Sequence, residues 1–230
     1  MFAKYWLQGL LALLLVTCAA PQLARADIAQ QCVVVYIELA PGSQAHGERI
    51  LDHLATVAFT AGARRFDVDK EVQRSNRFVL IETWNDQATY TAFKNSSVTQ
   101  ALFAQLAQLQ IAPLDERPGT LIQAGKVADA PAHGGEIEVV THIDVIPTFL
   151  DQAKPLILQF VADSANDAGV REFLLVSWDG ITNHFQLIER YATARAFDLH
   201  VSAQHTVAFR NALQPFIGAP YDERAYTVHP

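Results

Sequence analysis

Two segments of this chain, 107 residues apart, repeat one pattern. Residues 111–117 read IAPLDER and residues 218–224 read GAPYDER. A stretch rich in Ala and Gly at 123–135 separates the two copies and is typical of a linker. Because a repeat at a fixed offset indicates a duplicated structural unit, we expect a first domain at 27–122 and a second domain at 136–230.

Each copy shows the same order of secondary-structure signals. A β-branched run predicts a first strand at 32–39 and at 136–145, and a proline-marked turn leads into a helix at 43–61 and at 148–168. A hairpin, two shorter helical pieces and a last strand follow, at 64–84, 86–109 and 114–122 in the first copy and at 170–191, 193–213 and 221–228 in the second. The order β-α-β-β-α-β is the split βαβ, or ferredoxin-like, plan.

The predicted strands are apolar on both faces. Phe78, Leu80 and Trp84 alternate with Val79 and Ile81 on one of them. Helices cover only one face of such a sheet, so we expect the sister copy to cover the other face. The predicted fold class is therefore α+β: tandem ferredoxin-like repeats that form a pseudo-dimeric barrel within one chain, with further homodimerisation left open.

The first 26 residues have the features of a secretory signal peptide. Lys4 precedes an apolar run at 7–16, and the segment ends in an Ala-Arg-Ala motif at 24–26. The run is shorter than the about 20 residues that a membrane-spanning helix needs. We expect an exported, periplasmic protein without a membrane span; a lipoprotein anchored at Cys18 is the alternative reading.

Composition and missing motifs exclude several classes of function. The net charge is −7 and the Lys and Arg residues are scattered, which argues against a nucleic-acid partner. Dinucleotide, Walker and serine-nucleophile motifs do not occur. Neither H-E-x-x-H nor CxxC occurs, so no metal site is expected. After cleavage, Cys32 would be the only cysteine, and its apolar neighbours favour a buried role over a catalytic one.

A set of residues at the end of one strand and in the following helix carries a family resemblance: Glu189, Tyr191, Phe197, His200, Ser202 and His205. This segment resembles antibiotic biosynthesis monooxygenase (ABM) domains, the quinol monooxygenases among them. The resemblance extends over nearly all of residues 27–230, taken as two fused ABM domains. It implies an α+β barrel that oxidises a quinol-like or polyphenolic molecule with molecular oxygen and uses no flavin, haem or metal. The protein would supply a dry pocket, a base and donors for a developing anion.

The second copy retains more of this motif than the first. His200 and His205 correspond to Phe93 and Val98 of the first copy, which cannot transfer protons. If one half is active, we therefore expect the site to lie in the second domain. On a continuous helix the two histidines would lie about 140° apart, so a joint site requires a helix break near Ser202.

Glu189 is the third candidate catalytic residue. It recurs as Glu82 in the first copy, and a carboxylate in an apolar strand is costly unless it is paired. It is either an acid or base with a raised pKa or the partner of an arginine such as Arg117 or Arg224. Its presence in both copies favours the structural role.

The candidate substrate-binding residues are aromatic and imidazole side chains of the second copy: His142, Trp178, Tyr191, Phe173, Phe185 and Tyr221. Aromatic side chains at strand spacing are more often ordinary core. Two functions thus remain open: a cofactor-independent quinol-type monooxygenase, and a non-catalytic barrel that binds a small hydrophobic ligand or a protein partner. Catalysis requires His200 or His205 to face a closed cavity beside aromatic rings.

Overall fold

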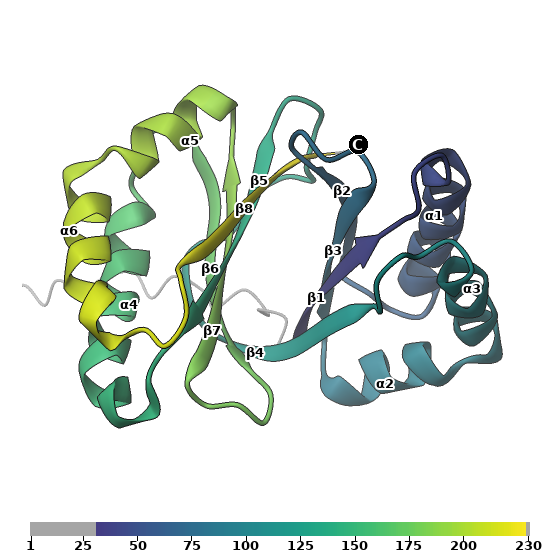
Figure 1. Cartoon of the computed structure of the whole chain (residues 1–230), viewed down its shortest axis with the longest axis horizontal. Helices are drawn as coiled ribbons and strands as arrows, with labels where there is room; N and C mark the ends of the chain where they lie inside the picture. Colours follow the sequence, from purple (N-terminus) through teal and green to yellow (C-terminus); the bar gives the residue numbers. More distant parts are fainter. Residues whose placement is uncertain (1–30, 229–230) are drawn as a thin grey trace, which may run out of the picture.

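Residues 31–228, the part of the chain that the computed structural model describes, form two β-α-β-β-α-β halves in succession (Figure 1). The first half contains β1 (Gln31–Glu38), α1 (Gln44–Thr60), β2 (Arg65–Glu71), β3 (Arg77–Trp84), α2 (Gln87–Asn95), α3 (Ser97–Ala107) and β4 (Asp115–Lys126). The second contains β5 (Ile137–Asp144), α4 (Leu150–Ser164), β6 (Val170–Trp178), β7 (His184–Tyr191), α5 (Ala194–Val201), α6 (Gln204–Leu213) and β8 (Asp222–Thr227). The expected signal peptide and the Cys18 alternative lie outside the described residues.

The eight strands close into one barrel in the order β1-β3-β2-β8-β5-β7-β6-β4. Within each half the strands are antiparallel, with the first strand between the third and the fourth. The halves join at two seams, β4 with β6 and β8 with β2. Their helices lie on opposite sides of the strands (Figure 1). The predicted α+β barrel of tandem repeats is confirmed.

Strand β4 runs into the segment that the sequence predicts to be a linker. Gln123 pairs with Leu175 and Lys126 pairs with Phe173, so residues 123–126 belong to the β4–β6 seam. At the other seam only Lys70 and Glu71 of β2 pair with β8. The β4 extension follows from the tertiary fold, because β6 offers it a free edge to pair with.

Alternation along the strands produces three cores. Side chains on the outer face, such as Val33 and Leu80 in the first half, pack against the helices. An equivalent core forms under the helices of the second half. The inner face contributes a third apolar cluster inside the barrel, which includes Val34, Val79 and Cys32. Both sheet faces are therefore buried, as the sequence predicts, and burial raises the pKa of the Cys32 thiol to about 12.

Among the described residues, no helix combines the length and apolarity that a transmembrane helix requires.

Candidate functional site

A break between α5 and α6 brings two imidazoles to one carboxylate. Helix α5 ends at Val201, Ala203 is extended at φ −63° and ψ 145°, and α6 begins at Gln204. His200 Nδ1 lies 2.8 Å from Asp167 Oδ2, and His205 Nε2 lies 3.2 Å from the same oxygen. The helix break expected near Ser202 is therefore present, and its effect is to direct both histidines to Asp167.

Asp167 is the residue of this group that sequence reasoning missed. The helix predicted at 148–168 ends at Ser164, and a turn follows in which Asp167 N donates to Ser164 O and Val170 N donates to Asp167 O. At the repeat offset the first half has Thr60, so the repeat pattern gives Asp167 no counterpart. No sequence pattern links a single carboxylate to a histidine 33 residues later. The contact between Asp167 and His200 follows only from the packing of α5 onto this turn.

Gly169 permits that packing. Its φ is +86°, and an added Cβ would lie 2.6 Å from the Cβ of Ala196 in α5. We expect Gly169→Ala to destabilise the fold by about 1–3 kcal/mol, because α5 must shift away from the Asp167 turn. Gly180→Ala is the matched control: its φ of +77° is similar, but its Cβ would meet nothing within 4 Å. Urea unfolding measures both, and equal losses would contradict a role in α5 packing.

His200 lies in the core of the second half. It is 2% exposed, and its ring centroid is 5.3 Å from that of Tyr191, 5.6 Å from Phe160 and 5.7 Å from Phe173. Burial lowers the pKa of His200, although Asp167 opposes the shift. Its Nε2 faces Glu189 Oε2 at 4.0 Å. His200 thus links Asp167 at the turn to a buried acid on β7.

Glu189 is an acid with a raised pKa. It is 1% exposed, Tyr191 OH donates to Oε2 at 2.6 Å, and Thr141 Oγ1 donates to Oε1 at 3.2 Å. Burial raises its pKa to about 8, so the carboxyl is mostly neutral at pH 7. In the first half Trp84 Nε1 donates to Glu82 Oε2 at 2.9 Å, and burial raises the pKa of Glu82 to about 8 as well.

The alternative in which these acids pair with Arg117 or Arg224 is wrong. Both arginines lie on the inner face of the barrel, where each bonds to an aspartate of its own strand, Asp115 or Asp222. Both stack on the ring of Tyr36, at 4.5 Å and 5.0 Å from its centroid. Alternation along β4 and β8 directs them away from the helix layer that contains Glu82 and Glu189.

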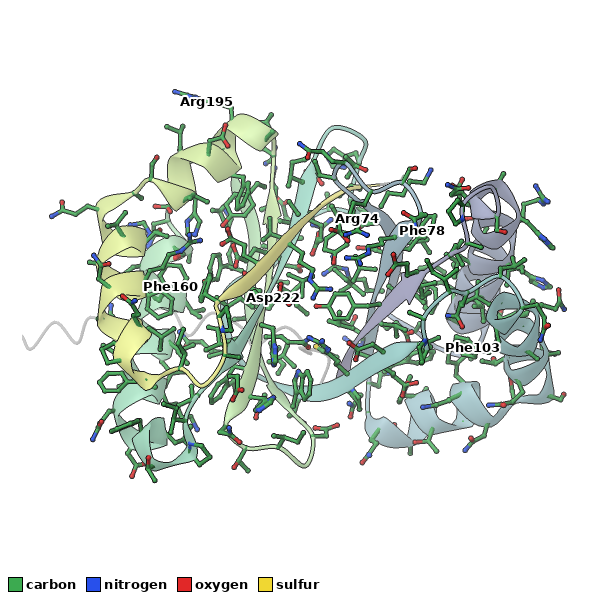
Figure 2. The ribbon with its side chains drawn as sticks, in the orientation of Figure 1. Arg74, Phe78, Phe103, Phe160, Arg195 and Asp222 are labelled. Atoms are coloured by element: carbon green, nitrogen blue, oxygen red, sulfur yellow. The ribbon has the colours of Figure 1, made fainter. Side chains whose placement is uncertain are left out.

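His205 lines an open groove and not the closed cavity that catalysis was expected to require. Its side chain is 26% exposed, and the groove between α4 and α6 holds about 300 Å³. One wall is formed by Phe160 and Phe209, whose rings stack with centroids 4.0 Å apart and an interplanar angle of 4° (Figure 2 labels Phe160). The two histidines therefore have different settings: His200 is enclosed by aromatic rings, and His205 is in contact with solvent.

The sheet divides the predicted substrate-binding residues between two compartments. Tyr191, Phe173 and Phe185 are buried in the helix-side core of the second half, and Tyr221 packs at its edge. His142 and Trp178 lie on the inner face of the barrel, stacked at 4.9 Å. The prediction of a single aromatic pocket is wrong in this respect, because residues on opposite faces of a strand cannot line one cavity.

The carboxylate of Asp144, on the same face of β5 as His142, pairs with His184. His184 Nε2 lies 3.1 Å from Asp144 Oδ1, and the His142 ring is 5.2 Å from that of His184. Burial lowers the pKa of His142 to about 4, with the charge of Arg117 adding to the effect.

Three of these side chains have the chemistry of metal ligands. One ligand-type atom from each of Asp167, His200 and His205 lies within 4.8 Å of the others. The sequence predicts no metal site, because the spacing of these residues matches no metal motif. A second acidic group, Asp67, Asp69 and Glu138, lies inside the barrel close to Arg65, which bonds to Glu138 at 2.9 Å.

Residues 31–105 match the family model of antibiotic biosynthesis monooxygenase. The first half of the chain therefore contains a segment that matches an ABM domain. The match covers most of the first half, whereas the histidine pair that carries the resemblance lies in the second. A search of curated proteins finds no match for this chain.

Several solved structures share the fold of this chain. A candidate monooxygenase from Fusobacterium nucleatum is 17% identical with a TM-score of 0.76, covering 87% of this chain and 93% of its own. A candidate monooxygenase from Lactobacillus acidophilus is 11% identical with a TM-score of 0.69, covering 87% and 94%. An anthrone oxidase-like protein is 13% identical with a TM-score of 0.67, covering 88% and 92%. At these identities the likeness shows the fold, two ABM-like halves within one barrel.

Proposed function

We propose that this protein is an exported monooxygenase of the ABM type, which oxidises a quinol or polyphenolic molecule with O2 in its second domain and needs no cofactor. One observation carries the proposal. An imidazole, His205, lines a groove that Phe160 and Phe209 also line, and its Nε2 lies 3.2 Å from the carboxylate of Asp167. Export is proposed from the leader pattern at residues 1–26.

The His205–Asp167 pair has the arrangement of a general base. A phenol bound in this groove can pass its proton to the His205 ring, and Asp167 stabilises the imidazolium that forms. The phenolate can then reduce O2 and combine with it at a conjugated CH2 carbon, and loss of water leaves a carbonyl. One CH2 group and one O2 thus give one C=O group and one water, so no external reductant is required.

The first half lacks the histidines of the second, which supports a site in the second domain. Phe93 and Val98 occupy the repeat positions of His200 and His205, and Phe93 packs on Trp84 with ring centroids 4.9 Å apart. Its buried acid, Glu82, faces an indole donor and no imidazole. We infer that the first half acts as the barrel partner of the second.

Oxygen uptake by chelator-treated mature protein, residues 27–230, tests the proposal. A panel of reduced naphthoquinols, anthrones and polyphenols is offered, with heat-denatured protein measuring autoxidation. We expect uptake above autoxidation with at least one substrate and, with ¹⁸O2, one labelled oxygen in the product. A flat response across the panel would overturn the enzymatic proposal.

The binding alternative is favoured by a different observation. A pocket of about 410 Å³ opens at one end of the barrel, with Cys32, Leu121 and Leu174 as apolar lining. Arg65 and Glu172, which bond to each other at 2.5 Å, add a polar side. A protein that takes up no oxygen but copurifies with a small hydrophobic ligand, detected by native mass spectrometry, would establish this second function.

A further inference from the structure

Three side chains from separate elements converge at the junction of α5 and α6. Asp167 comes from the α4–β6 turn, His200 from the end of α5 and His205 from the start of α6. Asp167 Oδ2 is 2.8 Å from His200 Nδ1 and 3.2 Å from His205 Nε2. Around a tetrahedral zinc ion with bonds of about 2.0–2.1 Å, neighbouring nitrogen and oxygen ligands lie roughly 3.4 Å apart. Small side-chain adjustments therefore suffice for one ion to reach all three atoms.

The surroundings hold His200 in the orientation that a ligand requires. Its ring is enclosed by aromatic side chains and is 2% exposed, so little rotamer freedom is left to lose on binding. With Nδ1 directed at Asp167, Nε2 faces the Glu189 carboxyl at 4.0 Å. A carboxyl group behind a ligating imidazole is a recurrent feature of metal sites, where it fixes the tautomer and orientation of the ring. Tyr191 and Thr141 hold that carboxyl in place.

We propose that Asp167, His200 and His205 bind one divalent transition-metal ion, with Zn²⁺ as the reference ion. Two imidazoles and one carboxylate suit Zn²⁺ and its neighbours better than Mg²⁺ or Ca²⁺, which prefer oxygen ligands alone. Three protein ligands leave a fourth position for water or for a small ligand. His205 lines the α4–α6 groove, which gives the ion a path from solvent.

The metal site does not depend on the proposed oxidation. An ion bound to the His205 nitrogen that now faces Asp167 separates the pair that would act as the general base. Metal binding and cofactor-free proton transfer therefore exclude each other at this imidazole. We expect Zn²⁺ to inhibit whatever metal-free turnover the protein shows. The first half has no equivalent of this site, because Thr60, Phe93 and Val98 occupy the repeat positions of its ligands.

Direct metal binding tests this inference without reference to turnover. Chelator-treated mature protein is titrated with Zn²⁺ by calorimetry and with Co²⁺ by visible absorption. We expect one ion per chain and visible cobalt bands typical of a four- or five-coordinate site. Zn²⁺ should also raise the melting temperature, because it binds the folded state preferentially.

Single-residue variants test whether the ion binds at Asp167, His200 and His205. His205→Ala is expected to weaken binding by more than about 100-fold, and Glu189→Gln by about 10-fold or more through the orientation of His200. His53→Ala, on the exposed face of α1, is the matched control and should bind as the wild type does. His205 is partly exposed at the start of α6, so its loss leaves the core intact.

Three results would overturn the site: no stoichiometric binding by the wild type, unchanged binding in His205→Ala, or loss of binding in His184→Ala, which would move the ion to the barrel interior. The outcomes separate this inference from the proposed function. Metal binding without oxygen uptake would leave the site standing and remove the monooxygenase. Oxygen uptake only in the presence of the metal would keep the site and overturn cofactor-free oxidation.

Discussion

Replacement of His205 by alanine is expected to lower metal-free turnover by about 10²–10⁴-fold, the usual contribution of a positioned general base. The imidazole combines contact with Asp167 at 3.2 Å with exposure to the α4–α6 groove, whereas His200 is enclosed in the core. The loss should fall on the proton-transfer step, so that KM changes far less than kcat.

Initial rates of oxygen uptake, measured in the presence of a chelator, check this expectation. His53→Ala controls for the loss of an imidazole elsewhere on the surface, and the thermal unfolding of both variants should match that of the wild type. A His205→Ala protein that retains its rate would show that another group accepts the proton. In that case Glu189 would be the next residue to replace, because it is the buried acid nearest to His200.

Replacement of Glu82 by glutamine is expected to flatten the pH dependence of stability between pH 5 and pH 8. Burial raises the pKa of the Glu82 carboxyl from about 4.5 to about 8 in the folded protein. Between these values the unfolded chain has released a proton that the folded chain still holds, so the free energy of unfolding falls as the pH rises. At pH 7 this one group destabilises the wild type by an amount on the order of 3 kcal/mol relative to pH 4.

Urea unfolding at pH 4.5, 6, 7 and 8 measures the effect. The slope with pH is the informative quantity, because glutamine also changes the hydrogen bond that Trp84 donates. Burial raises the pKa of Glu189 to about 8 as well, so part of the slope should remain in Glu82→Gln and should decrease further when both are replaced. Asp52→Asn, on the exposed face of α1, is the matched surface control. Parallel curves for Glu82→Gln and the wild type would contradict the buried, neutral state of this carboxyl.

The architecture could be predicted from the sequence, because the patterns that indicate it are local and occur in both copies of the repeat. The repeated IAPLDER and GAPYDER segments defined two equivalent units, and alternation such as that of Phe78 and Val79 showed that both sheet faces needed cover. The hairpin predicted at 170–191 begins and ends where β6 and β7 do in the structure. The extension of β4 to Lys126 was missed, since it is stabilised by pairing with β6 and not by its own residue pattern.

Only part of the candidate site could be predicted from the sequence. His200, His205 and Glu189 were singled out, and the helix break that unites the two histidines was anticipated from their spacing. Asp167 was missed. His142 and Trp178 were placed in one substrate-binding set with Tyr191, Phe173 and Phe185, although they lie on the opposite face of the sheet. Periodicity assigns a side chain to one face of its own strand, but it does not say which faces of different strands meet.

The sequence by itself determined the duplication, the order of elements and the two-faced burial that makes a barrel necessary, because each depends on the spacing of residues along one chain. The tertiary structure alone decided which polar groups meet. Asp167 reaches His200 and His205 only because Gly169 lets α5 pack onto its turn. Such a contact depends on how two elements pack across the core. The residue pattern of neither element alone predicts it.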